Sequence, residues 1–380
     1  MNLERRALDR RDDPTPRPRP AKILARWILA LLAVVPLVIF AREFVGYTMT
    51  YSRTQLHPAA GVDGPPRAYY LDWRRDWEDL DALRKAAREG VMATPRALRK
   101  DGRLVPDPIG VIQGGLAIHD QLLDDPDQPE RRRILHDQLE WLRTSAVWLP
   151  DSVPVWPCYW SAGEYGLEGP WISAITQGQA VSLLTRGATY FDDSRYLRLA
   201  GHALAALRSP ALPLIRSVDG DILFEEFPSV PPSTVLNGAL CAWLGVWDYY
   251  RATGDPEVHD YAIRTIAAMD RRIGAYELGD WTRYDLIKTR PVSPTYQEIH
   301  ATLAEAVHAI TRERTWGERA GRWRSAANRP EIRARVFFQV LMAKVDRHWG
   351  GSVVRPRPEA MPSGLSGAPL AVRENSANRP

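Results

Sequence analysis

The residue types best suited to proton chemistry lie in two short runs of this sequence. The run from 224 to 238 reads FEEFPSVPPSTVLNG and contains the adjacent carboxylates Glu225 and Glu226. The run from 281 to 300 reads WTRYDLIKTRPVSPTYQEIH and contains tyrosines, cations and a histidine. Both runs place ionisable groups beside prolines or glycines, and such irregular segments often present functional side chains. A carboxylate, phenols and cations can together transfer protons and stabilise negative charge.

The two adjacent glutamates should face opposite sides of the chain. Residues 215–227 read IRSVDGDILFEEF, and Asp219-Gly220 in the middle predicts a hairpin turn between short strands. Side chains alternate along a strand, so only one of Glu225 and Glu226 can enter a site. The pair therefore cannot serve together as acid and base.

The second run offers two phenols close to positive charge. A phenol has an ordinary pKa of about 10, so Tyr284 and Tyr296 need nearby cations to exchange protons at neutral pH. Lys288 and Arg290 lie between them in sequence and could supply that field or bind a carboxylate. His300 follows Tyr296 by one helical turn and would share its face if a helix begins near the preceding proline. The alternative for each tyrosine is a buried ring with a satisfied hydroxyl.

A third run, GPWISAITQGQAVSLL at 169–184, completes a resemblance to a known family. In order and spacing, the three runs resemble the C-terminal catalytic domain of the D-glucuronyl C5-epimerases, which invert uronic acids within a polysaccharide. The resemblance covers roughly residues 105–325. It implies a mainly α-helical fold, an α/α toroid in the form of an incomplete or full (α/α)6 barrel with a short β-hairpin. It also implies that no cofactor is needed, and a structural divalent cation is left open.

The same resemblance assigns chemical roles. Glu226, Tyr284 and Tyr296 are implied as the catalytic groups that remove the C5 proton and return one to the other face of the sugar. Animal members of the family have a tyrosine where this chain has Phe227, and an arginine where it has Ile287. The expected activity is that of an isomerase similar to heparosan-N-sulfate-glucuronate 5-epimerase.

A second set of residues is expected to bind the substrate. In one helix, Gln177 and Gln179 face about 200° apart, so at most one amide points into a site, and we take Gln177. Trp171, at the expected helix start, is the candidate for stacking on a sugar. Asn237 is either a hydrogen-bonding residue of the site or a helix-packing amide. The full substrate-binding set is Trp171, Gln177, Asn237, Lys288, Arg290 and His300, with His300 orienting Tyr296 or a sugar hydroxyl.

The N-terminal part of the sequence predicts a membrane anchor. Residues 1–22 are polar and rich in Arg and Pro, which indicates a disordered cytoplasmic leader. Residues 23–41 form an apolar run broken only by Arg26, long enough to span a bilayer as a signal anchor. Eight Lys or Arg residues lie before or at the start of this run, which places the following domain outside the cytoplasm. A cleaved signal peptide is the alternative.

Beyond the anchor, we expect a linker at 42–75, an α/α-toroid domain at 76–350 and a disordered tail at 351–380. Apolar periodicity within the domain predicts helices at 76–88, 109–123, 129–147, 171–188, 195–207, 233–251, 257–273, 297–312 and 331–346.

Composition limits the partners. The charged fraction of 25% and the hydrophobic fraction of 45% are typical of a folded protein. A net charge of +4 suits an acidic polysaccharide but is too diffuse to indicate a nucleic acid. Cys158 and Cys241 show no metal-ligand spacing, and either a disulfide or two buried thiols fits the sequence. A homodimer is left open.

Two other functions fit the same residues. A polysaccharide lyase acting on uronic-acid polymers also begins by abstracting the C5 proton. A non-catalytic protein for exopolysaccharide binding or assembly could use the same fold, because a fold does not fix a function. Phe227 and Ile287 are the sequence features that favour this second alternative.

Overall fold

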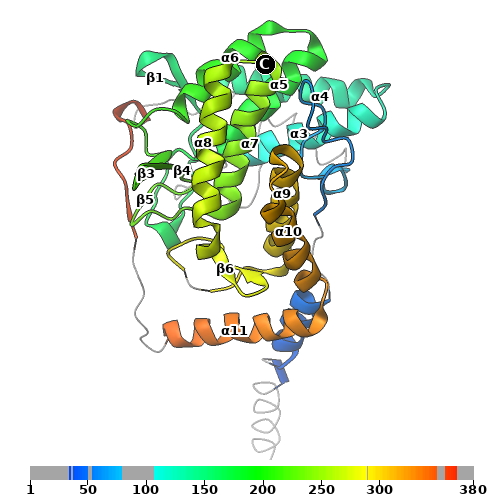
Figure 1. Ribbon diagram of the computed structural model, residues 1–380, viewed down its shortest axis with the longest axis vertical. Helices are drawn as coiled ribbons and strands as arrows, with labels where there is room; N and C mark the ends of the chain where they lie inside the picture. The colour runs from blue at the N-terminus through cyan, green and yellow to red at the C-terminus, as the bar shows by residue number, and fades with distance from the viewer. Residues whose placement is uncertain are drawn as a thin grey trace, which may run out of the picture.

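The computed structural model describes residues 34–35, 37–49, 54–78, 107–288, 290–348 and 356–365, and this part of the chain is mainly α-helical. Its helices form two layers (Figure 1). The inner layer consists of helices that pack in series: α3 (Pro108–Asp124), α5 (Ala174–Phe191), α7 (Leu236–Thr253) and α9 (Pro294–Thr311). Each helix of the outer layer packs on the inner helix that precedes it: α4 (Pro129–Ser145), α6 (Ser194–Ala206), α8 (Pro256–Arg272) and α10 (Arg314–Ala327).

The prediction of a mainly α-helical fold is confirmed. The paired helices follow one another as they do in an α/α toroid, and closure of a ring remains a prediction. Most expected helices lie within three residues of the observed ones, whereas α10 was missed. The helix expected at 76–88 falls largely outside the described residues, and its described start belongs to a 3-10 turn, η1 (Arg74–Trp77).

The sequence explains where the helices begin and end. Asp255 caps α8 by accepting hydrogen bonds from the backbone N–H groups of Glu257 and Val258, and a proline follows it at the first helical position. Gly254, with a φ of 71°, ends the preceding helix in the left-handed conformation that glycine adopts without strain. Inner and outer helices are thus connected by a very short turn.

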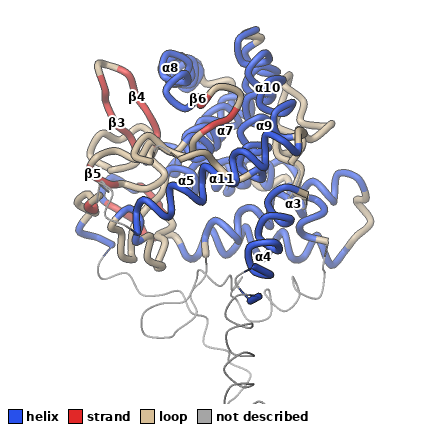
Figure 2. Tube along the Cα trace, turned by 90° about the horizontal axis from the view of Figure 1, so that it is seen from below, coloured by secondary structure: helices blue, strands red, loops and turns tan. Residues whose placement is uncertain are grey.

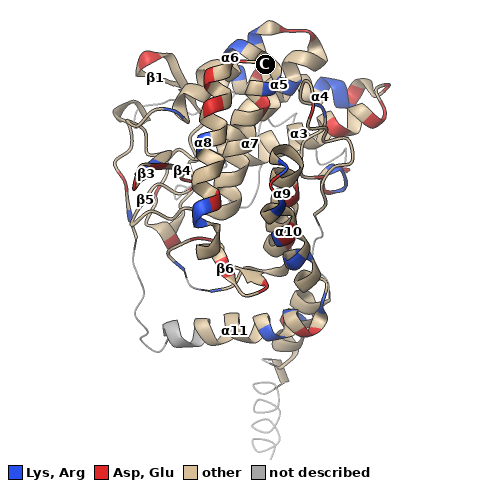
Figure 3. Ribbon diagram, viewed as in Figure 1, with Lys and Arg blue, Asp and Glu red and all other residues tan. Residues whose placement is uncertain are grey.

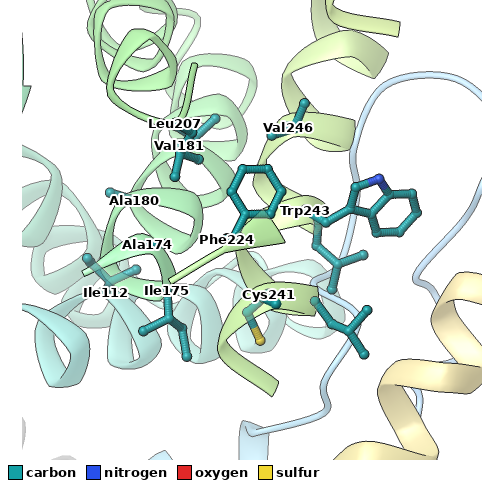
Figure 4. Close-up of a cluster of buried hydrophobic side chains, with 14 of the residues drawn as sticks. Ile112, Ala174, Ile175, Ala180, Val181, Leu207, Phe224, Cys241, Trp243 and Val246 are labelled. Atoms are coloured by element: carbon teal, nitrogen blue, oxygen red, sulfur yellow. The ribbon is translucent and has the colours of Figure 1, made fainter. Parts of the chain in front are cut away.

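The core lies between the inner helices and the hairpin strand next to them (Figure 4). Ile112, Val181, Trp243 and Phe224 are all buried there. Close approach of α5 and α7 depends on small residues, because a Cβ on Gly178 would lie 2.4 Å from the Cα of Ala242. Larger side chains here would force the two inner helices apart.

The short strands form two-stranded antiparallel ladders. The predicted hairpin is confirmed, since β3 (Ile215–Val218) pairs with β4 (Asp221–Phe224) across Asp219 and Gly220, whose φ angles are 52° and 83°. The strand ends at Phe224, so Glu225 and Glu226 follow it rather than belonging to it. The other ladders are β1 (Val147–Leu149) with β2 (Val153–Val155), β5 (Ser229–Val230) with β8 (Arg357–Pro358), and β6 (Glu277–Leu278) with β7 (Trp281–Thr282).

The expected linker at 42–75 is wrong for residues 68–71, which are buried in the core. Tyr69 and Tyr70 are fully buried. Arg186 of α5 donates hydrogen bonds to the carbonyl oxygen of Arg67 (2.8 Å) and pairs with Asp248 of α7 (2.6 Å). The buried run from 68 to 71 is only four residues long, so no apolar periodicity revealed this segment.

The expected disordered tail at 351–380 is also wrong in part. Residues 356–365 are described, and they contain β8, which pairs with β5, and the buried side chain of Leu365. Glu359 pairs with Arg216 of β3. The segment therefore closes over the hairpin.

One further helix, α11 (Pro330–His348), lies across the end of the molecule, beside a helical segment at 37–48 (Figures 1 and 2). Tyr47 of that segment donates a hydrogen bond to the carbonyl oxygen of Val292 (3.0 Å). Among the described residues, no helix combines the length and apolarity that a membrane crossing requires. The predicted anchor at 23–41 lies mostly outside them.

Candidate active site

The three sequence runs meet around Glu226. Ser173, just before α5, donates from its hydroxyl to the backbone carbonyl of Glu226 (2.8 Å). The hydroxyl of Tyr284 donates to Oε1 of the same glutamate (3.1 Å), and the side-chain amide of Asn237 lies 3.5 Å from Oε2. The carboxylate of Glu226, which is only 5% exposed, therefore accepts from groups of the first and second runs, while the third run holds its backbone carbonyl.

Tyr284 connects Glu226 to Tyr296. The two tyrosine rings meet edge to face, with centroids 5.0 Å apart and an interplanar angle of 78°. Burial, followed by the negative charge of Glu226, raises the pKa of Tyr284 well above its ordinary value. Tyr284 therefore stays protonated at neutral pH and acts as a hydrogen-bond donor. Tyr284 thus contacts both Glu226 and Tyr296, and the catalytic roles of the three residues remain a prediction.

Backbone pairing fixes the two runs relative to each other. The N–H of Leu236, at the start of α7, donates to the carbonyl oxygen of Tyr284 (3.0 Å). The N–H of Leu286 donates to the carbonyl oxygen of Ser233 (2.9 Å). Tyr284 thus enters the site from a loop held against the first turn of α7, while Tyr296 comes from the first turn of α9.

Glu225 points away from this cluster, as strand alternation predicted. Its carboxylate accepts hydrogen bonds from the backbone N–H and the hydroxyl of both Ser233 and Thr234, at 2.7–3.2 Å. Burial raises the pKa of Glu225 even so. We read Glu225 as the group that closes the loop between β4 and α7, which leaves Glu226 to the site.

Gly238 makes room for the Glu226 carboxylate. A Cβ at Gly238 would lie 2.3 Å from Oε2 of Glu226, closer than real contacts allow. Asn237, next to it, is 7% exposed and its Oδ1 is buried without a hydrogen-bond partner. A buried acceptor in that state carries a free-energy cost that a ligand hydroxyl can remove. Gly238 therefore leaves space for the Glu226 carboxylate, and Asn237 places an unpaired amide oxygen beside it.

An aromatic cluster supports the site from behind. Phe227 lies parallel to Tyr165, with centroids 4.2 Å apart, and also contacts Trp171 and Trp160. Trp171 is fully buried and its Nε1 donates to the carbonyl oxygen of Trp160 (2.8 Å). Trp171 lies before α5 and exposes no face to a sugar, so its predicted stacking role is wrong. Trp160 is half-buried and is the ring of this cluster nearest to solvent.

The predicted cations lie in a charged network rather than beside Glu226. Lys288 pairs with Glu164, approaches Asp285 (3.5 Å) and donates to the hydroxyl of Tyr165 (2.9 Å). Arg290 also pairs with Glu164 (3.3 Å). Both cations are therefore bound to acidic groups already, and an incoming carboxylate would compete with the half-exposed Glu164 for them.

Tyr165 and Asp285 also belong to this network. The sequence analysis did not identify them as residues that position other groups. Asp285 is fully buried and accepts hydrogen bonds from the hydroxyl of Tyr165 (2.6 Å) and from the backbone N–H groups of Ile287 (3.0 Å) and Lys288 (2.6 Å). Burial, followed by the charge of Asp285, raises the pKa of Tyr165. The aspartate directly after Tyr284 in the sequence was the available signal.

His300 lies one helical turn after Tyr296 and is fully buried. Its Nδ1 is 2.7 Å from the hydroxyl of Thr282, and its Nε2 has no hydrogen-bond partner. Burial lowers the pKa of His300 to about 3, so the ring is neutral at physiological pH. The role that the structure shows is to connect α9 to β7. Orientation of Tyr296 remains a prediction.

Gln177 does not belong to the site. It is buried, and its Nε2 donates to the carbonyl oxygens of Pro154 (2.6 Å) and Ala203 (3.1 Å). The prediction of a substrate contact is therefore wrong, because the amide joins α5 to β2 and α6. Cys158 and Cys241 are buried free thiols, which resolves the choice that the sequence left open.

No group of three or more His, Cys, Asp or Glu side chains suited to a metal ion occurs among the described residues. The expectation that no cofactor is needed remains a prediction, as does the divalent cation that the sequence left open. The side chains that are present fit acid–base chemistry without a prosthetic group.

The fold and the site define a helical-hairpin protein with a carboxylate–phenol centre at the ends of two inner helices. A family model described as the D-glucuronyl C5-epimerase C-terminus matches residues 151–325, a range that contains Glu226, Tyr284 and Tyr296. Residues 151–325 are therefore similar to the C-terminal domain of that family.

Individual relatives agree with this assignment. A D-glucuronyl C5-epimerase of Caenorhabditis elegans is 28% identical over 179 residues, which is 40% of this chain and 28% of that protein. An uncharacterized protein of Methanocaldococcus jannaschii is 27% identical over 152 residues, which is 38% of this chain and 49% of that protein. The chain thus matches half or less of the length of these relatives. Among solved structures, a family 76 glycoside hydrolase from a bovine Bacteroides thetaiotaomicron strain gives a TM-score of 0.45 at 10% identity, covering 70% of this chain and 64% of its own.

Proposed function

We propose that this protein is a C5-epimerase, independent of cofactors, that converts D-glucuronic acid residues of an acidic polysaccharide to L-iduronic acid. The observation that carries the proposal is the contiguous set formed by Glu226, Tyr284 and Tyr296 inside the family-matched region. A carboxylate and a second proton-transfer group, separated by a hydrogen-bonding phenol, are the parts that such a reaction needs.

Epimerisation removes the C5 proton from one face of the sugar and returns a proton to the other face. In the proposed step, the Glu226 carboxylate takes the proton, and the C5–H electron pair passes into an enolate of the C6 carboxylate. The Tyr296 phenol then gives its proton to the opposite face of C5, and solvent restores both groups. Tyr284, whose raised pKa keeps it protonated, donates to Glu226 and separates the two groups.

The enolate carries a second negative charge that the protein must offset. Lys288 and Arg290 belong to the charged network around Tyr165, whose ring stacks on Phe227, and both cations contact Glu164. We propose that the substrate carboxylate displaces Glu164, whose side chain is 57% exposed, and takes over these two contacts. Asn237 would then bind a sugar hydroxyl through its unpartnered Oδ1.

We also propose that residues 23–41 anchor the chain in the cell membrane as a single span, with the catalytic domain outside the cytoplasm. Support comes from the apolar run and from the excess of Lys and Arg that precedes it. A homodimer remains compatible with this arrangement.

Hydrogen exchange at C5 tests the reaction directly. Purified protein is incubated with heparosan or a related glucuronic-acid polymer in deuterated water, and deuterium at C5 is measured by NMR. Incorporation that depends on Glu226 supports the proposal, and its absence with every uronic-acid polymer tried would overturn it.

The same incubation separates the epimerase from a lyase. A lyase forms the same enolate but expels the substituent at C4, so it produces an unsaturated uronate that absorbs ultraviolet light. An epimerase produces no such absorbance. Binding without exchange or absorbance would favour the non-catalytic alternative, in which Phe227 and Ile287 mark a lost activity.

A further inference from the structure

Exposed large apolar side chains concentrate in two segments that lie outside the family-matched region. One is the helical segment at 37–48 with the residue that follows it, and the other is α11. The most exposed among them are Leu37 (65%), Val38 (59%), Ile39 (56%), Val45 (51%), Met49 (66%), Phe338 (49%) and Met342 (57%). Water-facing apolar groups gathered in this way mark a surface that contacts something else.

The two segments form one structure. The rings of Phe40 and Phe44 pack on Phe337, with centroids 5.6 and 5.3 Å apart, and both also contact Phe338. In Figure 1, α11 runs crosswise to the helical segment and lies beneath the rest of the domain. The end of the predicted anchor and one side of α11 are therefore in direct contact.

The two sides of α11 differ. On the inner side, Ile332 and Val336 are buried in a cluster with Trp281, and Tyr284 and Tyr296 pack against the same cluster. On the outer side, Phe338 and Met342 lie one helical turn apart and face solvent. Residues 336–343 contain no charged residue. Charged residues occur toward both ends of α11, at 331–335 beside α10 (Figure 3) and at 344–347 in the sequence.

We propose that the outer side of α11 lies in the interfacial layer of the membrane that residues 23–41 cross. This inference rests on the proposed anchor. The anchor ends at Ala41, and Phe44, which contacts α11, is three residues further on, about 4.5 Å along a helix. An amphipathic helix at that height lies in the membrane plane with its apolar side chains ~5–10 Å deep.

The occupant of this surface is a lipid bilayer rather than a soluble partner, because the predicted span places hydrocarbon next to it. The exposed Arg335, on the same side as Phe338, would meet lipid phosphates. Since the inner side of α11 packs against Tyr284 and Tyr296, the bilayer would then hold the site at a fixed height above the membrane.

A depth measurement on the full chain in liposomes tests the proposal. A Met342→Cys variant carries an environment-sensitive fluorophore, and Ile263→Cys, an exposed apolar position on α8, provides the matched control. The native thiols Cys158 and Cys241 are buried and should not react. Lipids brominated in the acyl chain should quench the label at 342 at least about twofold more than the label at 263.

The outcomes separate the alternatives. Equal quenching at both positions, while the protein floats with the liposomes, would overturn the inference and leave the anchor standing. Failure to float would overturn both. If the label at 342 becomes less quenched as more protein is added per liposome, and 342–342 cross-links form, a second copy of the chain covers this surface. That result would reject the bilayer as the occupant. C5 exchange is measured separately, so the activity and the membrane surface can fail independently.

Discussion

The ring of Phe227 lies parallel to the ring of Tyr165, with an interplanar angle of 7° and centroids 4.2 Å apart. Phe227 stands where animal members of the family have a tyrosine. In this chain the position supplies a stacking face, and the hydroxyl of Tyr165 on the other side of the stack is committed to Asp285. Tyr284 donates to Glu226 and its ring meets that of Tyr296, and in the proposed reaction these are the two phenols that remain.

Replacing the two adjacent glutamates should have opposite effects. Glu226→Gln should reduce C5 deuterium exchange by about 10²–10⁴-fold with little change in stability, because it removes a positioned base. Glu225→Gln should keep most of the exchange but lower the free energy of unfolding by roughly 1–3 kcal/mol, since an amide cannot accept all the hydrogen bonds from Ser233 and Thr234. NMR exchange and thermal unfolding check the pair. If Glu225→Gln loses C5 exchange while Glu226→Gln keeps it, the wrong glutamate was assigned to the site.

Tyr296→Phe should abolish exchange and leave the fold intact. The hydroxyl is the proposed proton donor, whereas the ring that contacts Tyr284 is kept. We expect a loss of about 10²–10⁴-fold in rate with an unchanged circular dichroism spectrum. Exchange at the wild-type rate would remove Tyr296 from the mechanism.

Gly238→Ala should inactivate the protein through Glu226. The added methyl group would meet Oε2 of Glu226 at 2.3 Å, so the carboxylate has to move. Gly321→Ala is the matched control, because a Cβ at this position of α10 meets nothing within 4 Å. The control should be neutral or stabilising by about 0.5–1 kcal/mol. Equal activity of both variants would mean that the position of Glu226 tolerates displacement.

His300 should make stability depend on pH. Its pKa is about 3 in the folded protein and 6.5 ordinarily. At a pH between these two values, His300 is protonated in the unfolded chain and neutral in the folded chain. The contribution is complete above pH 6.5 and is lost as the pH falls toward 3. His300→Gln should therefore reduce the stability difference between pH 7.5 and 4.5 by about 2–3 kcal/mol. Urea unfolding at both values measures it, and an unchanged difference would contradict the assignment.

Much of the fold could be predicted because its signals are local. Apolar periodicity, proline at helix starts and the Asp219-Gly220 turn all act within a few residues, and the corresponding elements are present. The burial of Tyr69 could not be predicted in this way, since it depends on Asp120, which accepts from its backbone N–H 51 positions later. The same holds for residues 356–365, whose partners, β5 and Arg216 of the hairpin, lie far earlier in the chain.

In the site, sequence patterns were better at indicating which residues have reactive side chains than at indicating whether a side chain faces a cleft or the core. The structure brings Glu226 and Tyr284 together, in agreement with the order of the motifs, and their catalytic roles remain a prediction. Trp171 and Gln177 were misplaced, because an apolar or amide side chain near a motif can equally well be buried. Only the packing of Trp160 and Phe227 around Trp171 decides that question.

Arg186 also has a consequence for the order in which the chain assembles. It donates to the carbonyl oxygen of Arg67, 119 positions earlier, while Tyr70 donates to Asp248, 178 positions later. Residues 67–70 leave the ribosome well before α5 and α7 exist, so they have no partners while most of the domain is still being synthesised. These residues are made early and can be fixed in place only after residue 248 has emerged.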